Sequence, residues 1–150
     1  MTDSAPTLRI ERIYIADCSL ENPNAPESFL YQEEPTVNVS VNPSHRKLND
    51  DLYEVSVNVN VTAAIKKTKK TMFICEVTQK GAFFMQNIPA EHHEILLNVT
   101  LPNTLFPYAR RAVDSLIVDA GFPPMHLPPA DFEAFYREKM AKEKDSAPVQ

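Results

Sequence analysis

The feature that most constrains the fold is a long alternation of apolar and polar residues between Tyr53 and Ile65. Valine occupies positions 55, 57, 59 and 61, and polar side chains from Glu54 to Thr62 stand between them. Because successive side chains of a strand point to opposite faces, this pattern predicts a strand with one buried face and one solvated face. Such strands are typical of an antiparallel sheet that is covered on one side only.

Three other segments have strand patterns: Leu8–Ala16, which is apolar in both registers, Thr36–Val41 and Thr71–Met85. In the last of these, Phe73, Cys75 and Val77 face one way, and Met72, Ile74 and Glu76 face the other. A lysine-rich segment, 66–70, joins the last two strands, and we interpret it as a solvated hairpin tip rather than a phosphate or nucleic-acid contact. We therefore expect a four-stranded antiparallel sheet with helices on one face, an α+β fold.

Two proline-containing segments are predicted to be ordered connections. Asp17–Pro35 is longer than an ordinary hairpin loop and contains Phe29, Leu30 and Tyr31, so we expect it to cross the sheet and cover part of it. Gly121–Pro129 should be ordered without regular secondary structure.

After Met85 the apolar pattern becomes helical. A short helix is expected from about Ala90, with an interruption at Pro102. A second helix then begins with Asn103 or Thr104 as its cap and ends just before Gly121, a residue that favours helix C-termini.

The apolar positions of this second helix come in adjacent pairs, which indicates cover on more than one side. One side is provided by the sheet, and our hypothesis is that another subunit provides the other. The residues predicted for this oligomer interface are Leu105, Ala109, Ala112, Val113, Leu116 and Ile117.

A last helix is predicted from about Asp131 to Glu143, with Phe132, Phe135, Tyr136 and Met140 on one face. Two interpretations of this face remain open. It either docks on the core of its own subunit or lines a groove for apolar ligands, a use to which aromatic side chains and methionine are well suited.

Composition argues against several functional classes. The net charge of −5 and the pI near 5.3 are unlike those of a general nucleic-acid binder. The two glycines, Gly81 and Gly121, are too far apart for a phosphate-binding loop. The adjacent His92 and His93 point apart on a helix, so they do not form a metal pair, and Cys75 reads as a buried strand residue rather than a nucleophile. We therefore expect no enzymatic activity, no metal and no cofactor.

The sequence has no apolar run long enough for a membrane helix and no secretion signal at its start. We expect a cytoplasmic protein that does not insert into a membrane and keeps Cys18 and Cys75 reduced. At this length one domain, 1–150, is expected, with flexible ends at about 1–7 and 144–150.

Several short stretches, in order and at family spacing, resemble the bacterial export chaperone family SecB. They are "RIY" followed by Asp17, "NPNAP" (22–26), "DDLYEV" (50–55), "CEV" (75–77), "LFPYAR" (105–110) and "GFPPMHLPPADF" (121–132). The resemblance implies a homotetramer, built as a dimer of dimers with the long helices at its centre. It also implies an ATP-independent holdase that keeps unfolded precursors translocation-competent and delivers them to the SecA motor, with no catalytic activity.

The resemblance also assigns two sets of residues. The groove for unfolded clients is expected to include Phe29, Val39, Val41, Leu127, Phe132, Phe135, Tyr136 and Met140. SecA docking is expected at Asp17, Glu21, Ile74 and Glu76. Two alternatives remain: a SecB-like chaperone that serves a toxin–antitoxin system, and a carrier of a small hydrophobic molecule, which would need an enclosed pocket with convergent polar groups.

Overall fold

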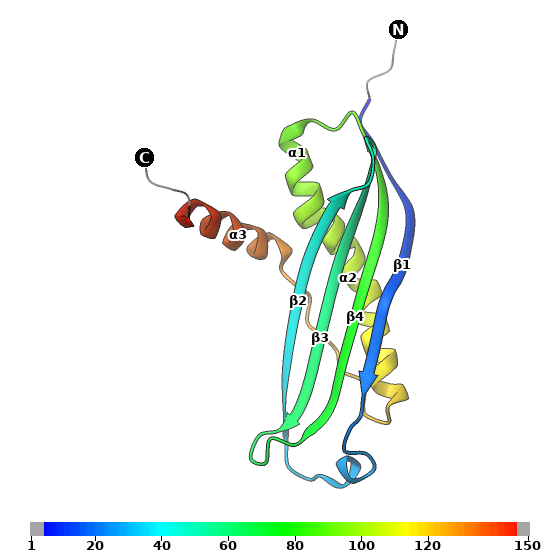
Figure 1. Ribbon diagram of the computed structural model, residues 1–150, viewed down its shortest axis with the longest axis vertical. Helices are drawn as coiled ribbons and strands as arrows, with labels where there is room; N and C mark the ends of the chain where they lie inside the picture. The colour runs from blue at the N-terminus through cyan, green and yellow to red at the C-terminus, as the bar shows by residue number, and fades with distance from the viewer. Residues whose placement is uncertain (1–4, 147–150) are drawn as a thin grey trace.

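The computed structural model describes residues 5–146, and its four strands form one antiparallel sheet. The strands are β1 (Thr7–Glu21), β2 (Pro35–Lys47), β3 (Leu52–Ile65) and β4 (Thr71–Gln86), in the order β1-β4-β3-β2 (Figure 1). The predicted fold class is thus confirmed. β1 and β2 both extend beyond their predicted bounds, and β2 continues through Pro43 because an edge strand tolerates a missing N–H donor.

The alternation of side chains between the two faces of the sheet is the one predicted. Val55, Val57, Val59 and Val61 of β3 are fully buried on the helix side, and Cys75 and Val77 of β4 join them. On the opposite face, Ile74 is 37% exposed. The helix side of β3 and β4 therefore forms the floor of the hydrophobic core.

The two predicted helices around Pro102 are one continuous helical run, so the predicted interruption is wrong. The run consists of α1 (Ala90–Ile95), a π-helical segment (Leu96–Thr100) and α2 (Leu101–Asp119). Pro102 has no N–H for an ordinary helical hydrogen bond, and the wider π turn accommodates it: the Leu101 N–H reaches the Leu96 carbonyl. Thr104 does not cap a helix, since its hydroxyl donates to the Thr100 carbonyl within the run (3.0 Å).

Gly121 ends α2 as predicted. Its φ of +97° is a conformation that favours glycine, and its N–H donates to the Val118 carbonyl (2.9 Å). The Phe122 N–H reaches back to the Ile117 carbonyl (3.2 Å), which completes a Schellman motif. The chain then runs to α3 (Phe132–Ser146), where the Asp131 carboxylate accepts the Ala134 N–H (3.0 Å) as an N-cap.

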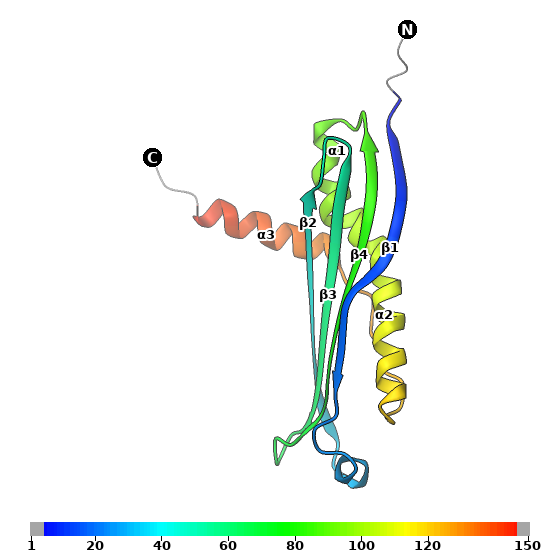
Figure 2. The same cartoon turned by 45° about the vertical axis from the view of Figure 1, so that its right-hand side comes forward.

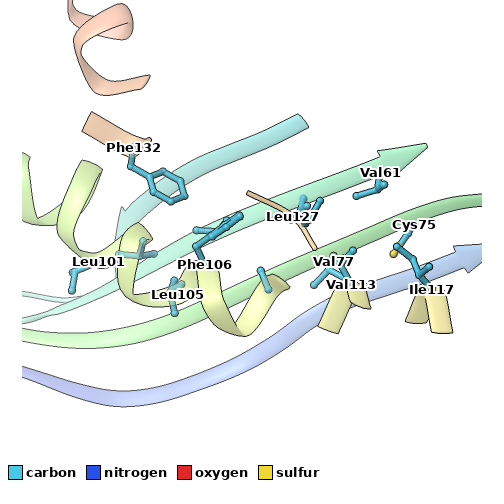
Figure 3. Packing of buried hydrophobic residues seen from close by; sticks show 14 of the residues in the cluster. Val61, Cys75, Val77, Leu101, Leu105, Phe106, Val113, Ile117, Leu127 and Phe132 are labelled. Carbon is cyan, nitrogen blue, oxygen red and sulfur yellow. The ribbon is translucent and has the colours of Figure 1, made fainter. Parts of the chain in front are cut away.

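Figures 1 and 2 show α1 and α2 on one face of the sheet, with α3 projecting away past the β2 edge. α2 packs on β3 and β4, where Figure 3 shows Val113 and Ile117 beside Val77 and Cys75. Phe132 reaches the same core from the start of α3.

Regular structure reaches into both of the ends that were expected to be flexible. Thr7 is the first residue of β1, and Lys144 lies in the last turn of α3. Residues 1–4 and 147–150 lie outside the described part of the chain. Within residues 5–146, no helix has the length and apolar character needed to cross a membrane.

Candidate binding surfaces

An apolar row on β2 is accessible on the helix-side face of the sheet. Because α2 lies on β3 and β4, it leaves this edge strand uncovered. Val37 and Val39 are 39% and 43% exposed, and Val41 is half-buried. We call Val37, Val39 and Val41 the β2 row. Val37 was not among the predicted groove residues, although its place in the same alternation could have identified it.

The predicted groove residues separate into an exposed and a buried set. Phe29, Val39, Phe135 and Met140 are exposed, and Val41 and Tyr136 are half-buried. Leu127 and Phe132, by contrast, are 4% and 1% exposed and belong to the core. Their assignment as groove-lining residues must be corrected, because the connecting segment and the start of α3 turn these two side chains inward.

Two adjoining hollows lie between β2 and α3. The apolar hollow, of about 390 Å³, is lined by Val41, Pro43, Phe135, Glu138, Lys139, Lys142 and Glu143. The polar hollow, of about 230 Å³, is lined by Pro43, Ser44, His45, Asn98, Phe135, Tyr136 and Lys139. They share Pro43, Phe135 and Lys139 and so form one surface with an apolar and a polar part.

A ladder of rings holds Phe135 in place at this surface. Phe135 meets Phe132 edge-on, with ring centroids 5.7 Å apart and planes at 85°. Phe132 in turn meets Phe106 of α2 at 5.9 Å and 71°. Because Phe132 and Phe106 are buried, the exposed ring of Phe135 rests on a fixed support.

A second aromatic cluster lies at the other end of the sheet, where the connection between β1 and β2 forms the short 3-10 helix Glu27–Leu30. Phe29 packs on Phe122 (centroids 5.2 Å apart), and Phe122 packs on Phe73 of β4 (5.1 Å). Asn22 fastens this connection by donating to the Ala120 carbonyl (3.1 Å). The connection therefore covers part of the core, as predicted, and leaves Phe29 exposed beside it.

The four residues predicted for SecA docking lie together on the sheet face that bears no helices. Glu21 is opposite Ile74 in the β1–β4 register, and Glu76 is opposite Ser19. Asp17, opposite Thr78, has the same orientation. These neighbours make a compact acidic patch around one exposed isoleucine.

A carboxylate on the same outer face links all four strands. Glu54 of β3 is 9% exposed and accepts hydrogen bonds from Tyr14 of β1 (3.2 Å), Arg46 of β2 (3.0 Å) and Lys80 of β4 (3.2 Å). The hydrogen bond from Arg46 is the largest of the effects that lower the pKa of Glu54, and Lys80 adds to it against the opposing effect of burial. This group could not be predicted from the sequence, because the alternation within one strand does not show which residues of other strands lie beside it.

The predicted oligomer interface also requires correction. Leu105, Ala109, Val113 and Ile117 are 0% exposed because they pack on the chain's own sheet, so they offer nothing to a second subunit. Ala112 and Leu116 remain half-buried.

Ala112 and Leu116 line a hollow of about 440 Å³ between β1 and α2. Its lining residues are Ile13, Tyr14, Ile15, Cys18, Gln79, Tyr108, Arg111, Ala112, Ser115 and Leu116. Leu8, Ile10 and Ile15 of β1 are exposed on the helix side of this edge strand. Together with the hollow, these side chains form another uncovered apolar surface, at the β1 edge of the sheet.

Groups suited to catalysis are poorly placed in the described residues. No three His, Cys, Asp or Glu side chains within 5–146 converge as metal ligands. Burial is the main effect that raises the pKa of the Cys75 thiol, to about 11, so the thiolate nucleophile is not formed at neutral pH. Cys18 is exposed, and neither thiol is bridged.

The sheet carries helices on one face only, and apolar side chains are exposed at both of its edges, a feature of proteins with interaction surfaces. The family model described as preprotein translocase subunit SecB matches residues 1–143. The chain therefore belongs to the SecB family, which is a family of chaperones rather than of enzymes.

Individual relatives agree with this assignment. The protein-export protein SecB of Neisseria meningitidis serogroup A is 48% identical over 142 residues, which cover 95% of this chain and 96% of the relative. That of Chromobacterium violaceum is 45% identical over 141 residues, 94% and 93% of the two chains. Among solved structures, a SecB-like chaperone of Mycobacterium tuberculosis, in complex with a peptide from the HigA1 antitoxin, superimposes with a TM-score of 0.66. The match covers 83% of this chain and 91% of that one at 15% identity, so this likeness bears on the fold alone.

Proposed function

We propose that this chain is an ATP-independent holdase that binds unfolded precursor proteins and keeps them competent for export. The observation that carries the proposal is the uncovered β2 row. It follows the connection that bears the exposed Phe29, and it ends at Val41, which lines the apolar hollow together with Phe135. An unfolded chain can lay apolar side chains along such a surface, whereas a folded protein has already buried them. The relatives named above carry the export function in their names, which favours export over a toxin–antitoxin role.

Delivery to the SecA motor is proposed to use the acidic patch of Asp17, Glu21, Ile74 and Glu76. Its carboxylates would attract a basic partner and set the association rate, and Ile74 would supply an apolar contact at the centre. The protein is proposed to work in the cytoplasm as one domain, without catalytic activity and without a cofactor.

The subunits are proposed to form a homotetramer, a dimer of dimers. The apolar row on β1 and the hollow between β1 and α2 are the surfaces that support this assembly, in place of the buried α2 residues predicted from sequence. Both are continuous with the core, so a partner that covered them would extend the burial of apolar side chains.

The experiment uses one strand with two faces. Val39→Asp places a charge in the β2 row, and Asn38→Asp places the same charge on the outer face of the same strand. An unfolded precursor is diluted from denaturant into either variant or the unaltered protein, and its refolding or aggregation is followed by fluorescence and light scattering. We expect Asn38→Asp to protect the precursor as the unaltered protein does and Val39→Asp to protect it much less. Equal protection by the two variants would contradict a client surface on this face.

A further inference from the structure

The turn that joins β3 to β4 is a compact source of positive charge at one end of the sheet (Figure 1). Its four lysines, Lys66, Lys67, Lys69 and Lys70, are all exposed, and we call them the lysine hairpin. The Lys70 ammonium lies 5.8 Å from the centre of the Tyr31 ring. The other three lysines make no ion pair within residues 5–146, so their charges are available to a partner.

Hydrogen bonds hold this turn in a defined conformation. The Lys69 N–H donates to the Ile65 carbonyl (2.7 Å), and the Ile65 N–H donates to the Lys70 carbonyl (2.9 Å). Lys69 has a φ of +58°, a conformation that glycine and asparagine adopt at lower cost. The turn geometry therefore does not call for a lysine at this position, and its charge needs another explanation.

The lysine hairpin leads along β4 into the acidic patch proposed for SecA docking. Ile74 and Glu76 both lie on β4, and Glu21 of β1 is opposite Ile74. Glu76 is six positions from Lys70, roughly 20 Å at about 3.4 Å per residue of a strand. This side of the sheet thus presents positive charge, then an exposed apolar side chain, then negative charge.

Other carboxylates at this end of the sheet stand apart from that sequence of charges. Glu33 and Glu34 precede β2, which is separated from the patch strands by β3, and Glu27 begins the short 3-10 helix. The lysine hairpin outnumbers these three carboxylates. Because physiological salt screens charges beyond about 8 Å, a bound segment responds to the charges directly beside it rather than to the net charge of this end.

We infer that the lysine hairpin selects the charge order of the segment that docks on the acidic patch. Basic residues of that segment lie over Glu76 and its neighbours, an apolar residue contacts Ile74, and acidic residues lie beside the hairpin. A segment that is basic throughout is repelled where it reaches the lysines, so the hairpin sets specificity rather than overall attraction. The inference rests on the proposed docking role of the patch and names the charge pattern of its partner.

Two labelled peptides of identical composition test this charge order. In the blocked peptide, two lysines and two aspartates lie about six residues apart with one leucine midway; in the interleaved peptide, the lysines and aspartates alternate. Their net charges are equal, so long-range attraction does not separate them. Fluorescence anisotropy at low salt gives each Kd, and we expect the blocked peptide to bind about threefold to fivefold more tightly, the range for one or two exposed charge pairs. The difference should shrink in high salt.

Two variants that lose the same number of charges show where the preference arises. Lys66→Gln with Lys67→Gln should lower the ratio of the two Kd values at least about twofold, because the aspartates lose their partners. Lys47→Gln with Lys144→Gln, at the end of β2 and on α3, should leave the ratio unchanged. A purely structural role of the hairpin lysines would weaken both peptides alike and keep the ratio.

Equal binding of the two peptides to the unaltered protein, or a ratio that survives loss of the hairpin lysines, would overturn the inference. The docking proposal would still stand if Glu76→Lys loses SecA binding. If Glu76→Lys binds both SecA and the blocked peptide as the unaltered protein does, the docking proposal is wrong and the inference fails with it.

Discussion

Replacement of Phe132 by alanine tests whether α3 is anchored to the core through this one side chain. Phe132 is 1% exposed, and full burial of a phenylalanine contributes about 1.5–3 kcal/mol. Its edge-on pairs with Phe106 and Phe135 each add about 0.5–1.5 kcal/mol. We therefore expect a loss of about 4 kcal/mol, within the range of about 3–5 kcal/mol for buried Phe→Ala changes. This is a large part of the roughly 5–15 kcal/mol that stabilises a typical domain.

The assay is urea unfolding at a fixed protein concentration, with Phe135→Ala as the matched control. With a slope of about 2 kcal/mol per molar urea, the Phe132→Ala midpoint should fall by about 2 M. Phe135 is 36% exposed, so its removal should lower the midpoint by less than half as much. Equal shifts for the two variants, or a shift below about 0.5 M for Phe132→Ala, would refute the anchoring role.

Three further changes test other parts of the structure. A methyl group at Gly81 would lie 2.6 Å from the buried Phe83 ring, so Gly81→Ala should lower the urea midpoint by the equivalent of about 1–3 kcal/mol. The hydrogen bond from Arg46 lowers the pKa of Glu54 in the folded protein below its ordinary value of 4.5. The ionised carboxylate therefore stabilises the fold above pH 4.5, and this contribution is lost as the pH falls through the lower folded pKa. Glu54→Gln should accordingly flatten the fall in unfolding free energy between about pH 5 and pH 3. Glu76→Lys should abolish binding of SecA in a pull-down and leave client binding intact, and loss of both would mean that Glu76 supports folding instead.

The strand alternation predicted the sheet well because a strand that is buried on one face records this in every second residue. β3 shows this most clearly, with its valines all on the helix side. The helical part was less predictable. Pro102 is an ordinary signal for an interruption, but the π turn before it lets the helix continue, and this depends on backbone geometry that residue types do not specify.

The sequence allowed a prediction of which face of a strand or helix carries each candidate site, but not of how deeply each side chain is buried. An aromatic stripe on α3 gives no indication that Phe132 enters the core while Phe135 stays at the surface, because that depends on where the connecting segment 121–131 directs the helix. The same holds for α2, whose apolar pairs include both sheet-facing residues such as Val113 and the partly accessible Leu116. The links from Glu54 to three other strands depend on register, which a single strand pattern leaves open.

The central claim is that this SecB-family chain binds unfolded polypeptides and ignores folded ones. Size-exclusion chromatography with light scattering tests it most directly, on the protein alone and mixed with one precursor in chemically unfolded and in folded form. We predict a tetramer that co-elutes with the unfolded precursor and elutes separately from the folded one. A monomer, or a tetramer that treats both forms alike, would contradict this account.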